Sequence, residues 1–178
     1  MSTANNNAVA ESRPPFPDPA PLFAKLEALG IQTKTVEHEP TFTVADNHLL
    51  GHELPGAHVK NLFVRDKKGK RMWMLICREN KPVDLKASAA VIGADRLSFG
   101  SPDRMQTYLG ISPGSVSAFA LLNDTTCAVT CVIDDDVLQD DIINVHPWRC
   151  DRTTAIARDD LLRFLEDIGH KPQICTLL

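Results

Sequence analysis

Two apolar-rich runs, residues 61–66 and 71–78, flank the charged segment Lys67-Lys68-Gly69-Lys70. A short polar segment with a glycine between two such runs predicts a β-hairpin, because glycine gives a tight turn the backbone freedom it requires. Helical patterns precede and follow this hairpin, and the chain of 178 residues has the size of one domain. We therefore expect an α+β domain with a mixed, largely antiparallel, curved sheet and helices packed around it.

The remaining elements follow from caps and periodicity. Asp18, Thr43, Asp84 and Ser101 are N-cap types ahead of helical patterns, and residues 159–168 have the pattern of an amphipathic helix. Residues 116–122, a turn at Asn123-Asp124 and residues 128–133 predict a second antiparallel pair of strands. We expect further short strands at 31–36, 97–99, 142–145, 153–156 and 174–178, and one helical turn at 134–138.

Composition limits where and how the protein works. The first 21 residues hold three successive asparagines and five prolines, so we expect 1–21 to be a disordered or extended arm and 22–178 to be the domain. We expect a cytoplasmic protein without membrane contact, because no apolar run is long enough to span a bilayer and the first residues do not have the pattern of a signal peptide. The net charge of −4 excludes a DNA-coating protein and leaves only a local contact with nucleic acid.

Five cysteines occur without a C-x-x-C pair. This spacing favours small buried side chains in a reducing compartment over a disulfide framework or a metal site. Cys127 and Cys131 are predicted to share one face of a strand, since they are four residues apart in an apolar run. We expect no metal and no cofactor.

Four loop-like segments place polar groups beside glycine or proline, while the common hydrolase and nucleotide-binding motifs are absent from the sequence. Lysine at a strand end can hold an anionic oxygen, glycines can present backbone N–H groups, and a fixed histidine can position a substrate. Each segment also has a plain structural interpretation: a solvated lysine, a helix-to-strand connection, a histidine bonded to backbone and capping threonines. The segments are Lys60-Asn61, 110–117, 144–147 and 38–43.

Taken together and in this order, the segments resemble the YbaK/ProX-type aminoacyl-tRNA deacylases, which are related to the editing insertion of bacterial prolyl-tRNA synthetases. The resemblance covers about residues 22–177. It is carried by His38-Glu39-Pro40-Thr41-Phe42-Thr43-Val44, Lys60-Asn61-Leu62-Phe63-Val64-Arg65-Asp66, Gly110-Ile111-Ser112-Pro113-Gly114-Ser115-Val116-Ser117, and His146-Pro147 followed by Thr153.

The resemblance implies a free-standing editing enzyme without a metal or cofactor that hydrolyses alanine from mischarged proline tRNA. Its partners would be the aminoacyl-tRNA acceptor end and prolyl-tRNA synthetase. Lys60 would hold the terminal adenosine phosphate or the ester oxygen, Gly114 would present backbone groups to the reacting carbonyl, and His146 would fix the aminoacyl end. A neighbouring ribose hydroxyl of the substrate would transfer the proton. Further substrate-binding positions would be Asn61, Thr41, Thr43, Ser115, Ser117, Pro147 and Cys150.

Two positions depart from the family's pattern. Ala118 replaces the proline that closes the glycine loop, and Cys150 stands where the histidine motif has asparagine. Loss of the proline frees one backbone dihedral angle, and a thiol is a weaker hydrogen-bond partner than an amide. Three alternatives therefore stay open: a deacylase for another small residue such as serine, a catalytically silent module that binds tRNA or a synthetase, and a redox role for an exposed Cys150.

Overall fold

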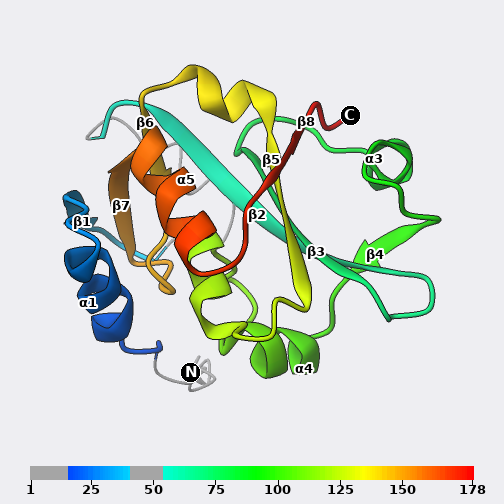
Figure 1. Cartoon of the computed structure of the whole chain (residues 1–178), viewed down its shortest axis with the longest axis horizontal. Coiled ribbons are helices and arrows are strands. Elements are labelled where there is room, and N and C mark those ends of the chain that lie inside the picture. The colour runs from blue at the N-terminus through cyan, green and yellow to red at the C-terminus, as the bar shows by residue number, and fades with distance from the viewer. Residues whose placement is uncertain (1–15, 41–53) are drawn as a thin grey trace, which may run out of the picture.

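The computed structural model describes residues 16–40 and 54–178. Its strands form one sheet in the order β1-β7-β6-β2-β3-β5-β8, and β4 pairs with β2 (Figure 1). Four pairings are antiparallel and three are parallel, so the expected mixed α+β sheet is confirmed. The strands are β1 (Thr33–Glu37), β2 (Ala57–Asp66), β3 (Met72–Arg78), β4 (Leu97–Phe99), β5 (Val129–Asp134), β6 (Ile142–Val145), β7 (Arg152–Ala157) and β8 (Gln173–Cys175). The helices are α1 (Ala20–Ala28), α3 (Leu85–Val91), α4 (Pro102–Arg104) and α5 (Arg158–Asp167), with short turns η1 (Met105–Leu109), η2 (Ala118–Asn123) and η3 (Asp135–Gln139).

The central strands β2 and β3 bury side chains on both faces of the sheet. Successive side chains of a strand point to opposite faces, so odd and even positions of β2 pack in different cores. Val59 and Phe63 belong to the larger core, which α1 and α5 cover. Val64 belongs to the smaller core, to which α3 and the C-terminal Leu177 contribute. The sheet is thus a middle layer between helices.

The predicted hairpin is confirmed: β2 and β3 pair from Val59↔Arg78 to Arg65↔Met72. Asp66 closes the turn, because its Oδ1 accepts hydrogen bonds from the backbone N–H of Lys70 at 2.8 Å. The predicted cap at Asp84 is confirmed by its hydrogen bonds from Lys86 N and Ala87 N. Helix α1 begins at Ala20, within the segment that composition assigns to the arm.

The predicted strand at 116–122 is wrong. Residues Ala118–Asn123 form the 3₁₀ helix η2, which Ser117 caps by accepting from Phe119 N. An apolar run this short fits a buried strand or a buried turn equally well, and here its small residues pack inside the larger core. The second antiparallel pair is therefore also wrong, since β5 pairs in parallel with β3 and with β8.

The cysteine prediction is confirmed for Cys77, Cys131 and Cys150, which are buried, but Cys127 is exposed. Cys127 lies before β5 with φ of 52°, so it does not share a strand face with Cys131. Burial of Cys150 removes the exposed thiol on which a redox role would depend. Among the described residues, no helix is long and apolar enough to cross a membrane.

Candidate functional site

The site lies where the edge of β2 loses its neighbouring strand. On the side away from β3, β2 pairs with β6 only at Ala57 and His58, and with β4 only from Val64 onward. Between these contacts, no other strand of the described chain pairs with this edge. A gap of this kind leaves backbone and side chains accessible to a ligand or to a loop. Lys60 and Asn61 occupy it.

Strand register places the sequence-predicted Lys60 and His146 just beyond the end of the β2–β6 pairing. His58 is paired with Asn144 in the last pair of these parallel strands, and Lys60 and His146 each follow this pair by two residues. On β7, Thr154 is paired with Val145, the residue before His146. Because alternate residues of a strand point to the same face, Lys60 shares the face of His58 on β2.

The Lys60 ammonium is anchored by a backbone carbonyl group. Its Nζ donates to the carbonyl oxygen of Lys81. The Lys81 side chain is fixed in turn by Asp134, at 2.6 Å, and by Asp136, at 3.0 Å. Burial acts to lower the pKa of Lys81, but its hydrogen bonds with the two carboxylates outweigh burial and leave the pKa above its ordinary value. The loop that holds Lys60 is therefore itself braced by ion pairs.

The His146 ring has a defined proton position. Its Nδ1 lies 2.8 Å from the carbonyl oxygen of Arg152, which can only accept, so Nδ1 carries the hydrogen and Nε2 keeps a lone pair. Burial lowers the pKa of His146, and the nearby histidines His38 and His58 lower it further against the opposing effects of Arg152 and Glu79. A neutral imidazole with a free lone pair can accept a proton or a hydrogen bond from a substrate.

Two further histidines complete the surroundings of His146. His38 Nε2 lies 2.9 Å from Thr153 Oγ1, and the rings of His38 and His146 are 6.1 Å apart in an edge-to-face arrangement. His58 Nε2 lies 2.9 Å from the carbonyl oxygen of Leu54. His38 begins the candidate segment 38–43, although no role was predicted for it, and His58 was not among the predicted site residues. His58 could have been found by strand alternation, since it precedes Lys60 by two residues on the same face.

The glycine loop is tied to the histidine motif. Gly114 is exposed and has φ of 88°, a conformation that favours glycine. The hydroxyl of Ser117 donates to the carbonyl oxygen of His146, and Ser115 N donates to Ser112 O at 3.1 Å. Both serines are buried. The loop therefore holds the start of the His146 motif, and its exposed part is Gly114.

Asn61 has a structural partner on the opposite face from Lys60. Its Oδ1 accepts from the backbone N–H of Ala118 at 3.1 Å, which fixes the first residue of η2. Ala118 is fully buried, so this hydrogen bond satisfies a donor that water cannot reach. A proline at this position would have no hydrogen to donate. The departure at Ala118 thus determines what the Asn61 side chain binds.

The other predicted site residues fall into two groups. Pro147 and Cys150 are buried beside His146 in the chain. Thr41 and Thr43 lie outside the described residues. Asn144 begins the candidate segment 144–147, and its Nδ2 donates to Pro55 O at 3.1 Å while its buried Oδ1 has no hydrogen-bond partner in the described chain. Within 16–40 and 54–178, no group of three or more His, Cys, Asp or Glu side chains is arranged to hold a metal ion.

Comparison with known proteins relates this chain to tRNA editing domains. The family model of the aminoacyl-tRNA editing domain matches residues 38–164. The prolyl-tRNA editing protein ProX of Acetoanaerobium sticklandii is 34% identical over 149 residues, which cover 84% of this chain and 91% of that protein. The prolyl-tRNA synthetase associated domain-containing protein 1 of Danio rerio is 33% identical over 153 residues, covering 85% of this chain and 83% of that protein.

The fold also matches solved structures. A crystal structure described as that of a candidate trans-editing enzyme for prolyl tRNA synthetase superposes with a TM-score of 0.67 at 19% identity. The match covers 92% of this chain and 98% of that chain. At this level of identity the likeness concerns the fold alone.

Proposed function

The chain belongs to the aminoacyl-tRNA editing domain family, and we propose that this aminoacyl-tRNA deacylase acts in trans on alanyl-tRNA(Pro). A prolyl-tRNA synthetase cannot exclude alanine by size, because alanine is smaller than proline. A second site that hydrolyses the smaller product is the general solution. The observation that supports the proposal is that Lys60 and His146 each lie two residues beyond the last β2–β6 pair, and that Ser117 of the glycine loop donates to the carbonyl oxygen of His146.

The reaction demands little covalent chemistry from the protein. Water adds to the ester carbonyl carbon, the bond from this carbon to the ribose oxygen breaks, and the ribose oxygen takes a proton. The products are free alanine and tRNA. An ester of this kind is already activated, so positioning and stabilisation of the oxyanion suffice. A neighbouring ribose hydroxyl of the substrate supplies the proton-transfer group in this scheme.

Lys60 binds the anionic part of the substrate in this proposal. Its ammonium leaves the carbonyl oxygen of Lys81 and binds a phosphate of the terminal adenosine or the ester oxygen. A neutral carbonyl is a weaker partner for an ammonium than an anionic oxygen, so the exchange favours the bound state. The ion pairs between Lys81 and its two carboxylates keep the loop in place during this exchange.

Gly114 and His146 act on the aminoacyl end. Gly114 is exposed, and its lack of a side chain lets the backbone approach the reacting carbonyl. Nε2 of His146 accepts a hydrogen bond from the α-amino group or from the attacking water, because its Nδ1 hydrogen is used by Arg152. We include prolyl-tRNA synthetase as a partner that supplies the mischarged tRNA, in line with the names of the relatives.

A second candidate, a module of the same fold that binds tRNA without hydrolysis, is favoured by one observation. The Ala118 N–H engages Asn61 Oδ1, so this amide oxygen is not available to a substrate as it would be beside a proline. In this case Lys60 would bind RNA, but the ester would not be positioned for attack.

Single-turnover hydrolysis separates these functions. We measure the rate at which each protein hydrolyses alanyl-tRNA(Pro), prolyl-tRNA(Pro) and seryl-tRNA. The proteins are the wild type, Lys60→Ala and the control Lys34→Ala, which removes an exposed lysine from β1. We expect hydrolysis of alanyl-tRNA(Pro) that falls by about 10²-fold or more in Lys60→Ala, the range for loss of one oxyanion donor, and that is unchanged in Lys34→Ala. An active Lys60→Ala enzyme would refute the role of Lys60. Tight binding of tRNA without turnover would establish the second candidate. Faster hydrolysis of seryl-tRNA than of alanyl-tRNA(Pro) would make serine, and not alanine, the residue that the enzyme removes.

A further inference from the structure

The turn of the β2–β3 hairpin carries a concentrated positive charge. Residues 65–71 hold five lysines and arginines and one aspartate, a net charge of +4. The whole chain carries −4, so the remaining residues together carry −8. Arg104 adds a further cation, because its guanidinium packs against Gly69 of the turn and donates to Met72 Sδ at 3.6 Å. We call Arg65, Lys67, Lys68, Lys70, Arg71 and Arg104 the hairpin cations.

Within the described residues, the hairpin cations have no ion-pair partner. Several basic side chains elsewhere pair with carboxylates, as in Arg149 with Asp151 at 2.6 Å and Lys25 with Asp167 at 2.6 Å. No carboxylate of the described residues forms an ion pair with any hairpin cation. The charge of this surface is therefore available to a partner.

The one carboxylate within the hairpin turn serves the backbone. Asp66 Oδ1 accepts from the N–H groups of Lys70 and Arg71. Burial acts to raise the pKa of Asp66, but hydrogen bonds from the backbone of Arg71, Lys70 and Gly69 outweigh it and lower the pKa. Asp66 shapes the turn, and it leaves the neighbouring ammonium groups unpaired.

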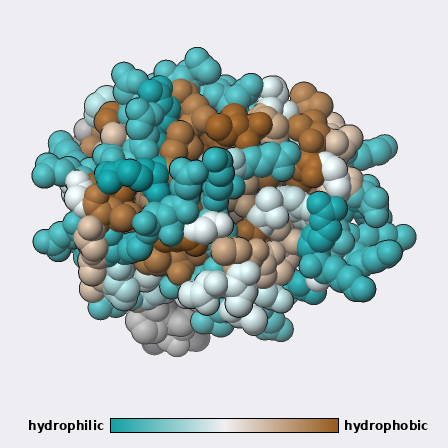
Figure 2. Space-filling view, in the orientation of Figure 1, coloured by the Kyte–Doolittle hydropathy of each residue, from teal (hydrophilic) through white to brown (hydrophobic). Residues whose placement is uncertain are grey.

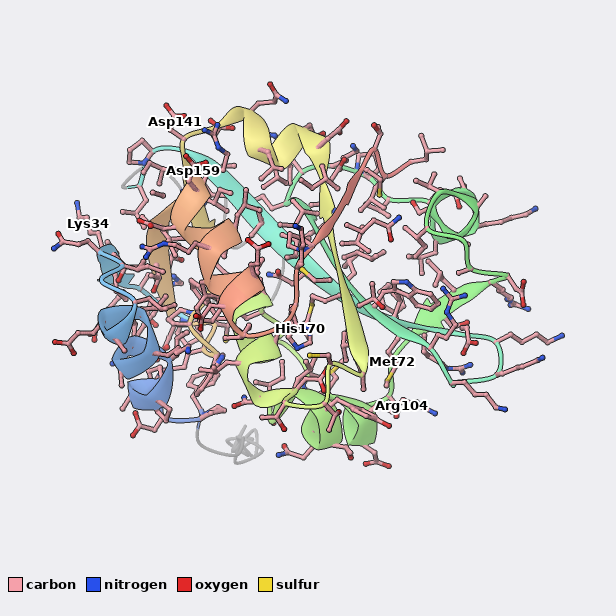
Figure 3. The ribbon with its side chains drawn as sticks, viewed as in Figure 1. Lys34, Met72, Arg104, Asp141, Asp159 and His170 are labelled. Atoms are coloured by element: carbon pink, nitrogen blue, oxygen red, sulfur yellow. The ribbon has the colours of Figure 1, made fainter. Side chains whose placement is uncertain are left out.

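Neutral groups hold the arginines in place. Arg65 Nη1 donates to the carbonyl oxygens of Asp66 and Lys67, at 3.0 and 3.2 Å. Arg71 lies over the Trp73 ring at 4.7 Å and donates to Gly93 O. In Figure 3, Arg104 and Met72 lie side by side next to the turn of the hairpin. Held cations lose less side-chain entropy when they bind an anion, and none of these contacts neutralises their charge.

The position of the surface relative to Lys60 indicates its partner. At a strand rise of about 3.3 Å per residue, Asp66 lies about 20 Å from Lys60 along the same strand. The hairpin projects from the body of the protein at the end of β2, and Figure 2 shows hydrophilic residues over this region (Figures 1 and 2). A substrate with its ester at Lys60 would reach the hairpin only if it continued as a long polyanion.

From these observations we propose that the hairpin cations bind backbone phosphates of the double-helical acceptor stem of tRNA. This inference rests on the proposed function, because it takes the ester of the same tRNA to lie at Lys60. Lysine and arginine side chains that contact phosphates supply affinity and orientation without reading sequence. The negative charge of the remaining chain repels RNA elsewhere, so the hairpin also steers the stem into one orientation. A rigid strand links the stem contact to the ester site.

The test compares two double charge reversals. Lys67→Glu/Lys68→Glu changes the hairpin, while the matched control Lys34→Glu/Lys171→Glu makes the same change of net charge at exposed lysines elsewhere. Each protein is assayed on full-length alanyl-tRNA(Pro) and on a minimal substrate, the alanyl ester of a single-stranded CCA oligonucleotide. Affinity for uncharged tRNA is measured over a range of salt concentrations, and urea unfolding confirms that each variant folds.

We expect the hairpin variant to lose about 10-fold or more in kcat/KM on the full-length substrate and to keep wild-type activity on the minimal substrate. Its binding should depend less on salt, with a slope reduced by about 2, since each lost phosphate contact reduces it by about 1. The control should match the wild type. The proposal is overturned if the hairpin variant keeps the kcat/KM and the salt slope of the wild type. This holds also if the variant loses its association with prolyl-tRNA synthetase, because the hairpin would then bind a protein and not RNA. Equal loss on both substrates would also overturn it.

Failure of the proposed function gives a different result. In that case the wild type hydrolyses neither substrate, and the salt dependence of tRNA binding then decides the inference separately. Weaker binding with a smaller slope in the hairpin variant alone would retain the hairpin as an RNA-binding surface. Unchanged binding would reject it.

Discussion

Asn61 and Ala118 provide a quantitative test of how the site is built. Asn61→Ala removes the acceptor of the Ala118 N–H, whose residue is fully buried, and leaves that donor unsatisfied. The penalty for such a donor is about 1–3 kcal/mol. For a domain of this length, about 2 kcal/mol lowers Tm by roughly 4–8 °C. We therefore expect Asn61→Ala to destabilise the protein although the residue lies beside the site.

Ala118→Pro supplies the matching background, because proline has no N–H to leave unsatisfied. Ala118 is the first residue of η2, a position that tolerates proline, and Ser117 has φ of −146° and ψ of 143°, the region preferred before proline. The lost hydrogen bond costs about 1 kcal/mol, and the stiffer unfolded chain returns about 0.4–1 kcal/mol. Ala118→Pro alone should therefore change stability little.

Urea unfolding of the four proteins of this double-mutant cycle gives the coupling energy. In the Ala118→Pro background we expect Asn61→Ala to cost less than about 0.5 kcal/mol, so that the coupling is about 1–2 kcal/mol. If Asn61→Ala has the same cost in both backgrounds, the hydrogen bond does not carry the effect and our reasoning is refuted. The ratio of alanine to serine hydrolysis in the same proteins measures whether release of the Asn61 oxygen alters the choice of substrate.

Three further predictions concern charge and packing. His146 acts in its neutral form with a pKa below its ordinary value, so kcat/KM should fall only as pH drops below about 6.5. His58→Gln should move this acid limb of the pH profile to higher pH, because it removes a charge that lowers the pKa of His146. An unmoved limb would exclude His58 as a cause of the lowered pKa. The same lowered pKa means that the unfolded state takes up the proton first, so the free energy of unfolding should decrease as pH falls below about 6.5, measured by urea titration. Gly100→Ala should destabilise the protein by about 1–3 kcal/mol, because its Cβ would overlap Cδ1 of the buried Phe63 ring. An unchanged Tm would show that the ring can move aside.

Local sequence patterns determined the elements whose causes are local. The hairpin follows from two alternating runs around a turn with Gly69, and the start of α3 follows from Asp84, whose carboxylate needs only the next three residues. The sequence also singles out Lys60, Gly114 and His146 as candidate site residues, because each stands in a short polar motif beside glycine or proline. These features depend on neighbours within a few positions.

The tertiary structure decided what depends on partners far away in the chain. Residues Ala118–Asn123 form a 3₁₀ helix whose apolar side chains pack inside the larger core, which the short apolar run alone did not distinguish from a strand. Lys60 and His146 each follow the last pair of the parallel strands β2 and β6, and the partner of Asn61 is a backbone group of η2. The sequence names candidate residues for the site, but register and packing fix which atoms meet, because non-local pairing is a property of the assembled sheet.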